Sequence, residues 1–319
     1  MPIAPSPRLF RVVADGPLAP AVTQPVEGKI EWLPWQVALE GSREPVDAVY
    51  TYGHPKLDGA MLDRLPGVKV ISNYGVGVDH IVLADARARG IPVGNTPGIL
   101  DGATADMGFA LLLASARRLI EGDRYARGPE FTTYDPGYML GREVHSKTLG
   151  IVGLGRIGRQ VARRARGFDM NVCYFNRHRR MDVEYEMGVR YVSFDELLAA
   201  SDFIMLTCPL TDATRGLIGR EAFAKMRPGA TLVNISRGPV VDTEALTEAL
   251  QSNRIAGAAL DVTDPEPLPR EHPLLKQPNL TIAPHLGSAT IETRQRMAEM
   301  SIENLLAGLR GEPLPHEVK

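Results

Sequence analysis

A glycine-rich turn between an apolar strand and a helix most constrains how this chain can fold. Residues 148–158 read Thr-Leu-Gly-Ile-Val-Gly-Leu-Gly-Arg-Ile-Gly. In a Gly-x-Gly-x-x-Gly turn, Gly153 allows the tight turn, Gly155 lets the backbone approach a pyrophosphate, and Gly158 lets the helix pack close to the strand. The helix N-terminus then presents N–H groups to phosphates. Because an apolar strand precedes the turn and a helical pattern over residues 159–168 follows it, we interpret it as a dinucleotide-binding turn rather than a structural one.

The end of the next predicted strand, residues 171–175, indicates which dinucleotide binds. Residues 176–180 read Asn-Arg-His-Arg-Arg, and no carboxylate appears before Asp182. An NAD site usually has an acidic residue here, about 20 residues past the glycines, to bind the ribose 2′-hydroxyl. Guanidinium groups such as those of Arg177 and Arg179 bind a 2′-phosphate instead. We therefore predict that NADP(H) is preferred and NAD(H) is possible; a solvated basic turn is the alternative interpretation.

Composition sets the broad class of protein. A chain of 319 residues is long enough for two domains. A net charge of −2 gives no bulk attraction to nucleic acid or anionic membrane. Cys173 and Cys208 lie in apolar runs, which predicts buried, reduced thiols in a cytoplasmic protein, and no grouping has metal-ligand spacing, so we predict no metal. Residues 1–7 are proline-broken and predict no secretory leader, and the apolar run at 109–116 is too short to span a membrane.

Short β-rich runs alternate with helical patterns along the chain, which predicts parallel sheets built from βαβ units. The expected strands are residues 9–13, 46–52, 68–72, 91–93, 148–152, 171–175, 203–207, 230–236, 256–260 and 280–283. The expected helices include residues 103–119, with Asp101 as the cap, 194–200, 242–251 and 290–309.

The mid-chain position of the glycine turn predicts the domain organisation. An α/β pattern precedes it, and one amphipathic helix follows the last strand. We therefore expect an α/β fold of two Rossmann-like doubly wound domains, with a dinucleotide-binding domain (residues 100–286) inserted into a discontinuous substrate domain (residues 1–99 plus 287–319). In such folds ligands bind at the carboxyl ends of the strands, so we expect the site in the cleft between the domains.

Three polar segments each follow a predicted strand in the second half of the chain. They are Asn-Ile-Ser-Arg-Gly at residues 234–238, Asp-Val-Thr-Asp-Pro-Glu-Pro at 261–267 and Pro-His-Leu-Gly-Ser at 284–288. An arginine, an acid and a histidine at strand ends near a nicotinamide site suit the reduction of a 2-oxo acid. The alternatives are a surface ion-pair partner for the arginine, a rigid turn around the acid, and an ordinary histidine.

With these four motifs in order, the chain resembles the D-2-hydroxyacid dehydrogenase family over essentially its whole length. Within that family it is most similar to the glyoxylate/hydroxypyruvate reductases, through residues 93–98, 260–269 and 304–313. The resemblance implies NADPH-preferring reduction of small 2-oxo acids to 2-hydroxy acids. A related dehydrogenase for D-lactate, D-phosphoglycerate or phosphite remains an alternative, although an end at Lys319 leaves no room for the C-terminal regulatory domain of many phosphoglycerate dehydrogenases. A dinucleotide-sensing corepressor is a further alternative, which an extended tail would favour.

The resemblance assigns a role to each catalytic candidate. Arg237 would bind the substrate carboxylate and keto oxygen through its planar fork. His285 would be the general acid in reduction and the general base in the reverse direction, since histidine ordinarily titrates near neutrality. Glu266 would hydrogen-bond the imidazole and orient it. Asp261 would orient the nicotinamide carboxamide, and hydride would pass from the nicotinamide to the carbonyl carbon.

The remaining site residues follow from the same resemblance. Predicted cofactor contacts are Gly153, Leu154, Gly155, Arg156, Ile157, Gly158, Asn176, Arg177, Arg179, Cys208, Pro209, Thr214, Ile235, Ser236, Asp261 and Gly287. Predicted substrate contacts are Val76, Gly77, Arg237, His285 and Ser288, with Val76 and Gly77 in a glycine-rich anion nest.

Two departures and a partner prediction complete the comparison with the family. Ser236 stands where the family often has alanine. Tyr138 lies in a loop, residues 130–141, where related reductases carry a tryptophan that reaches into the partner subunit's active site. We expect a homodimer whose interface is the helix at residues 103–119 and the loop that follows it through Leu140.

Overall fold

The computed structural model describes residues 8–319, which form two compact units. One unit combines residues 8–100 with Thr290–Lys319, and the other is Asp101–Ala289. Both boundaries lie slightly C-terminal to the expected ones, which followed residues 99 and 286. Residues 1–7, on which the expectation of no secretory leader rests, lie outside the described residues.

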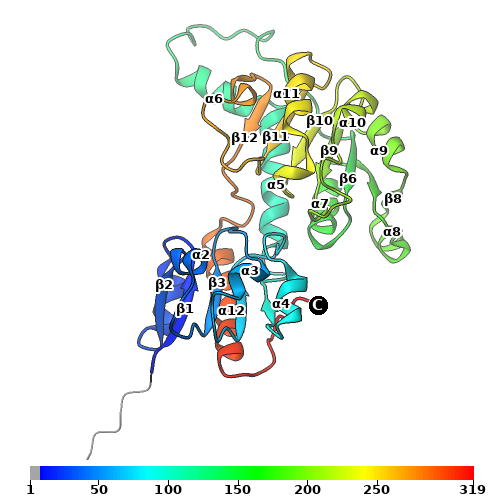
Figure 1. The fold of residues 1–319 in the computed structure, drawn as a ribbon. Coiled ribbons are helices and arrows are strands. Elements are labelled where there is room, and N and C mark those ends of the chain that lie inside the picture. The colour runs from blue at the N-terminus through cyan, green and yellow to red at the C-terminus, as the bar shows by residue number, and fades with distance from the viewer. Residues whose placement is uncertain (1–7) are drawn as a thin grey trace, which may run out of the picture. The chain divides into compact units, whose positions relative to one another are not determined.

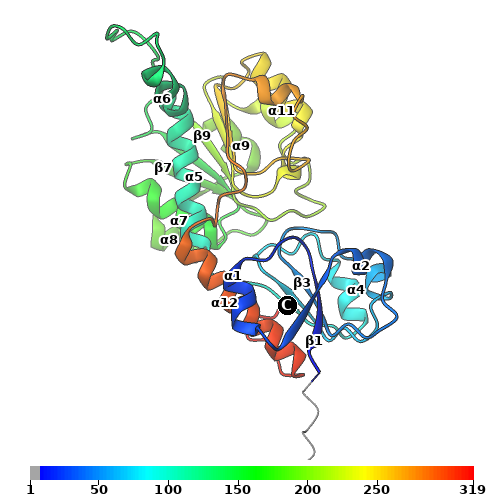
Figure 2. The same ribbon diagram turned by 90° about the vertical axis from the view of Figure 1, so that its left-hand side faces the viewer.

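The first unit is built on a five-stranded parallel sheet of order β2-β1-β3-β4-β5. Its strands are β1 (Phe10–Ala14), β2 (Ile30–Pro34), β3 (Ala48–Thr51), β4 (Val70–Asn73) and β5 (Val93–Gly94). Its helices are α1 (Pro20–Thr23), α2 (Gln36–Glu40), α3 (Gly59–Leu62), α4 (Leu83–Ala88) and α12 (Ile291–Leu309). In Figure 2, α1 and α12 lie on one side of this sheet, and α2 and α4 lie on the other.

Alternation along the strands explains this layering in the first unit. Val49 and Ile71 face the core shared with α2, α3 and α4, whereas their neighbours Tyr50 and Ser72 face α12. The Tyr50 hydroxyl lies 2.8 Å from the Ser301 hydroxyl, and Ser72 Oγ donates to the Ser301 carbonyl at 2.7 Å. Residues 290–319 therefore complete the unit that residues 8–100 begin.

The second unit is built on a seven-stranded parallel sheet of order β12-β11-β10-β9-β6-β7-β8 (Figure 1). Its strands are β6 (Thr148–Val152), β7 (Asn171–Phe175), β8 (Arg190–Tyr191), β9 (Phe203–Leu206), β10 (Thr231–Asn234), β11 (Gly257–Leu260) and β12 (Leu280–Ile282). Its helices are α5 (Asp101–Ala116), α6 (Leu119–Arg127), α7 (Arg156–Arg166), α8 (Met181–Met187), α9 (Phe194–Ala200), α10 (Arg220–Lys225) and α11 (Thr243–Gln251).

Both faces of this second sheet are covered. Leu149, Ile151 and Met205 share one core with α5 and α7. Val152 and Leu206, which point to the opposite face, share the other core with α9, α10 and α11. Figure 2 shows α5 and α11 on opposite sides of the strands. The strands of a sheet that is buried on both faces have continuous apolar sequences, as the strands of this unit do. The expected pair of Rossmann-like α/β domains is confirmed.

The structure corrects several expected elements. Asp101 is the first residue of α5 rather than its cap, where a carboxylate still faces the positive helix end. The helix expected over residues 103–119 ends at Ala116, and a separate helix, α6, begins at Leu119 after Arg118, whose backbone is left-handed with φ 51°. The glycine turn leads into its helix at Arg156, three residues earlier than expected. Strands β2 and β8 were not expected. Strand β8 has only two residues and shows no periodicity.

No helix within residues 8–319 is both long enough and apolar enough to cross a membrane.

Candidate active site

The glycine turn joins β6 to α7, and its three glycines meet different surroundings. Gly153 has a φ of 102°, and a Cβ there would lie 2.6 Å from the Cys208 nitrogen. A Cβ on Gly158 would overlap the Gly153 carbonyl. A Cβ on Gly155 would meet no protein atom within 4 Å. Gly153 and Gly158 are therefore required by packing within the protein, whereas Gly155 keeps space open outside the turn, which fits a pyrophosphate.

The helix after the turn also fits a phosphate. Helix α7 has no side-chain cap at Gly155 and no acidic residue in its first turn. Its first N–H groups and the positive end of its dipole are therefore suited to an anion.

Two side chains hold the turn in place. The Leu154 N–H donates to Asn176 Oδ1 at 2.7 Å, which ties the turn to the end of β7. Thr207 Oγ1 donates to the Gly153 carbonyl at 2.5 Å from the end of β9. Asn176 was predicted as a cofactor contact, and the structure gives its side chain this supporting bond. Thr207 was not predicted, and the signal that could have found it is its position at the end of an apolar strand.

These contrasting glycines give a first prediction. Gly155→Ala is expected to leave the thermal midpoint unchanged and to weaken dinucleotide binding at least tenfold, roughly, because its methyl group fills the space meant for the pyrophosphate. Gly158→Ala serves as the comparison, since overlap with backbone destabilises the fold by about 1–3 kcal/mol. Thermal melting and calorimetric titration with NADPH check both variants. Unchanged NADPH binding by Gly155→Ala would contradict the assigned pyrophosphate position.

The predicted ribose corner follows β7. Arg177 is exposed, and within residues 8–319 its side chain makes no hydrogen bond or ion pair. Arg179 pairs with Glu184, and Arg180 pairs with Asp182. The structure thus joins two of these arginines to carboxylates of α8, a partnership that the sequence interpretation did not foresee.

The ends of β9 and β10 lie side by side because these strands pair, and several of the predicted cofactor contacts lie there. Ser236 Oγ donates to the Cys208 carbonyl. Thr214 Oγ1 donates to the Pro209 carbonyl at 2.7 Å and so closes the loop after β9. Burial raises the pKa of the Cys208 thiol to about 11, so this thiol is protonated at neutral pH. Ile235 is buried in the core beneath α5.

A buried asparagine orders the segment that carries Arg237. Asn234 Nδ2 donates to the Arg237 carbonyl at 2.9 Å, and its Oδ1 accepts from the Ser236 N–H at 3.0 Å. Arg237 itself is half-buried, and its Nη1 donates to the Ser236 carbonyl at 2.9 Å. Asn234 opens the Asn-x-x-Arg-Gly motif but was not among the predicted site residues. Its burial at a strand end explains why an amide belongs there.

The structure brings Glu266 and His285 together from the loops after β11 and β12. Glu266 Oε1 lies 2.7 Å from His285 Nδ1. Since an imidazole bound at Nδ1 presents Nε2 to other groups, the pair has the geometry of an oriented proton donor. His285 has a φ of 56°, and its N–H donates to the Asp261 carbonyl at 2.9 Å. The backbone at 285 is therefore left-handed, a conformation that few side chains adopt easily.

Asp261 fixes the loop that carries the histidine. Its Oδ1 and Oδ2 accept from the N–H groups of Leu286 and Gly287 at 2.7 and 2.8 Å. Burial raises the pKa of Asp261, and the two N–H groups oppose that rise. Ser288 follows as a half-buried residue. Asp261 was expected to orient the nicotinamide, which stays a prediction, and its observed bonds hold the His285 loop.

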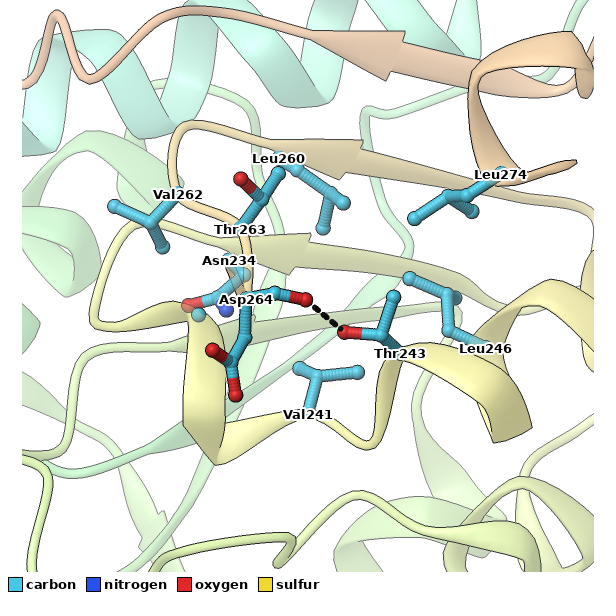
Figure 3. A pocket seen from close by; sticks show the side chains of 10 residues that line it. Asn234, Val241, Thr243, Leu246, Leu260, Val262, Thr263, Asp264 and Leu274 are labelled. Atoms are coloured by element: carbon cyan, nitrogen blue, oxygen red, sulfur yellow. Dashed lines mark hydrogen bonds between the residues drawn. The ribbon is translucent and has the colours of Figure 1, made fainter. Parts of the chain in front are cut away.

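The loop with Glu266 is anchored from α11. Thr243 Oγ1 donates to the Asp264 carbonyl at 2.9 Å (Figure 3). A Cβ on Gly238 would overlap the Thr263 carbonyl, so the segment after Arg237 and the loop before Glu266 touch backbone to backbone. The cavity drawn in Figure 3 measures about 10 Å³, which is room for a single water and not for a substrate.

The predicted substrate loop, residues 75–77, belongs to the first unit. Two side chains, one buried and one half-buried, bind its carbonyls through three hydrogen bonds. Asn73 Nδ2 donates to the Gly75 and Gly77 carbonyls at 2.8 and 2.9 Å, and Asn95 Nδ2 donates to the Val76 carbonyl at 2.8 Å. Within residues 8–319 the N–H groups of this loop donate to nothing. Bound carbonyls and available N–H groups are what an anion nest requires.

Between residues 8 and 319, no three His, Cys, Asp or Glu side chains come together as metal ligands would.

Comparisons with known proteins identify the family of this chain. The family described as D-isomer specific 2-hydroxyacid dehydrogenase, NAD binding domain, matches residues 109–287. A glyoxylate reductase of Korarchaeum cryptofilum is 49% identical over 273 residues, which are 85% of this chain and 82% of that protein. A glyoxylate reductase of Thermococcus litoralis is 48% identical over 289 residues, 89% of this chain and 87% of that protein.

A solved structure shows the same fold. It is an NADPH-dependent glyoxylate/hydroxypyruvate reductase from Sinorhizobium meliloti in complex with NADP and malonate. The TM-score is 0.88 at 29% identity, and the match covers 98% of this chain and 97% of that one. With the family match over more than half of its length and relatives close to half identical, the chain belongs to the D-isomer specific 2-hydroxyacid dehydrogenase family.

Proposed function

We propose that this protein reduces small 2-oxo acids, glyoxylate and hydroxypyruvate, to 2-hydroxy acids, with NADPH preferred and NADH usable. The observation that carries the proposal is the 2.7 Å contact between Glu266 and His285, in the same unit as Arg237 and a glycine turn with space for a pyrophosphate. The names of the relatives, glyoxylate reductases, support the substrate class. The exposed arginines after β7 support the 2′-phosphate.

Each side chain then has a defined task. A nicotinamide cofactor held at the glycine turn would supply the hydride for the carbonyl carbon. Arg237 binds the substrate carboxylate and the keto oxygen through its planar fork. His285 gives a proton to that oxygen, so that hydride and proton together reduce the carbonyl group to an alcohol. Glu266 holds the imidazole at Nδ1, which directs Nε2 to the substrate.

The test is steady-state oxidation of NADPH and NADH with glyoxylate, hydroxypyruvate, pyruvate and phenylpyruvate in parallel. We expect fast turnover on the first two acids with NADPH, and slower turnover with NADH. Turnover on the larger acids alone would move the substrate to that class. No turnover above that of a His285→Ala variant with any acid would reject the proposal and favour a cofactor-sensing role.

We further propose that Val76 and Gly77 bind the substrate carboxylate. Asn95→Ala is then expected to raise the KM for glyoxylate about tenfold, because the Val76 carbonyl loses its donor and the loop loses its orientation. The Kd for NADPH should stay unchanged, since the cofactor binds the other unit. A KM equal to that of the wild type would show that this loop does not bind substrate.

We also propose a homodimer. Helix α6 and the loop after it expose large apolar side chains that a partner would cover. They are Leu119, Ile120, Phe131, Tyr138 and Leu140. Sedimentation equilibrium tests the proposal, and a monomer at micromolar concentration would reject it.

A further inference from the structure

One of the two arginines predicted to bind a 2′-phosphate, Arg179, is already bound to a carboxylate. Its Nε and Nη2 donate to Glu184 Oε1 and Oε2, each at 2.8 Å, a two-bond arrangement of guanidinium and carboxylate. The Tyr174 hydroxyl donates to the same Oε1 at 2.8 Å. The Glu184 side chain is only 16% exposed, against 56% for Arg179. Glu184 is therefore held in place from the protein side while Arg179 reaches outward.

Two other arginines at this corner, Arg159 and Arg180, also lie beside a carboxylate. Arg180 donates to Asp182 through Nε and Nη2 at 3.1 and 2.9 Å. Arg159 lies 3.8 Å from the same carboxylate. Arg177 alone among these arginines makes no ion pair within residues 8–319.

We propose that Glu184 is a specificity-determining residue that weakens 2′-phosphate binding by competing with the phosphate for Arg179, which leaves Arg177 as the main phosphate ligand. The inference rests on the proposed preference for NADPH and explains why NADH remains usable. A guanidinium presents its donors in a fixed fork, and Glu184 occupies the edge formed by Nε and Nη2. A phosphate must displace that carboxylate or use the remaining edge beside a negative charge.

At neutral pH Glu184 carries the negative charge with which it competes for Arg179. The Arg179 guanidinium lowers the pKa of the Glu184 carboxyl below its usual range, so Glu184 stays ionised. Arg179 is also placed by the Tyr191 ring, whose centre lies 5.8 Å from its Cζ. Because that ring contact does not depend on Glu184, Arg179 stays at the corner when the carboxylate is neutralised.

Glu184→Gln is the sharpest variant. The amide oxygen still accepts from the Tyr174 hydroxyl, so the anchor remains while the negative charge is lost. Glu186→Gln is the matched control, since Glu186 lies on the same helix and pairs with Arg163 at 3.6 Å instead. Both variants remove one negative charge from α8, and only Glu184→Gln removes it from Arg179.

The experiment is calorimetric titration of the full chain with adenosine 2′,5′-bisphosphate and with 5′-AMP, neither of which requires turnover. We expect Glu184→Gln to bind the bisphosphate about tenfold more tightly than the wild type does. Its affinity for 5′-AMP should stay within about twofold of that of the wild type. The gain in affinity for the bisphosphate should shrink as salt screens the charges. Glu186→Gln should match the wild type with both ligands. Arg177→Ala should lose most of the discrimination between the two.

The outcomes separate this inference from the proposed function. If the wild type binds adenosine 2′,5′-bisphosphate and 5′-AMP equally, the NADPH preference is rejected. Tighter binding of the bisphosphate by Glu184→Gln would even then support competition for Arg179. A wild type that prefers the bisphosphate, with no change in Glu184→Gln, would overturn the inference alone. Equal weakening of both ligands in Glu184→Gln would make Glu184 a structural residue and would also overturn it, as would an equal gain in Glu186→Gln.

Discussion

His285→Asn is expected to lower kcat by roughly 10²–10⁴-fold, the range that a positioned general acid contributes. The imidazole is held at Nδ1 by Glu266, and an amide cannot give a proton to the developing alkoxide. Asparagine is the right replacement because the backbone at 285 is left-handed, with φ 56°, a conformation that asparagine tolerates. Stopped-flow measurement of NADPH oxidation with saturating glyoxylate checks the loss in the chemical step.

A graded series identifies the cause of that loss. Glu266→Gln keeps a hydrogen-bonding group beside the imidazole and removes only the charge, so we expect a smaller decrease of about tenfold. NADPH binding and the thermal midpoint should be unchanged in both variants. A kcat for His285→Asn within threefold of the wild type would remove His285 from the reaction, whatever the effect at Glu266.

Gly238→Ala is expected to lower the free energy of unfolding by about 3 kcal/mol, at the upper end for overpacking, and to reduce turnover at the same time. The added Cβ would overlap the Thr263 carbonyl, which is backbone and cannot move to another rotamer. The loop must shift, and Glu266 lies three residues further along it. Urea unfolding followed by circular dichroism measures the stability, and the glyoxylate assay measures the turnover.

Gly122→Ala is the matched control for that substitution. Gly122 lies in α6 with no atom within 4 Å of an added Cβ, so alanine there should stabilise the helix by about 0.5–1 kcal/mol. A stable Gly238→Ala protein with wild-type turnover would show that the loop moves aside freely. The backbone contact between the Arg237 and Glu266 segments would then have no role in placing the Glu266 side chain.

The sequence allowed the fold to be predicted wherever local chemistry decides it. The glycine turn, the apolar strands and the polar segments at their ends are each determined by nearby residues, and the structure confirms two parallel-sheet domains. Strand β2 was missed because Glu31 and Pro34 interrupt its apolar pattern. Its place in the sheet is decided by pairing with β1, which lies about 20 residues earlier in the chain.

The residues of the site could be predicted from their types and motifs. Which residues they bind could be predicted less well. Arg237, Glu266 and His285 stand in recognisable motifs, and the contact between Glu266 and His285 joins residues 19 positions apart. The bond from Arg179 to Glu184 depends on where α8 begins, and the bonds from Asp261 to the Leu286 and Gly287 N–H groups depend on two strand ends meeting. Such geometry follows from tertiary structure rather than from local pattern.

The return of α12 to the first unit has a consequence for biosynthesis. A ribosome makes residues 8–100 first, but the sheet face that receives Ser301 lacks α12 until residues 290–319 have emerged. At ordinary elongation rates this interval is on the order of ten seconds, during which the apolar surface around Tyr50 and Val70 lacks its helix. The second unit is continuous in sequence and is the part that can reach its final structure first. Chaperone binding to stalled nascent chains should therefore concentrate on the amino-terminal segment.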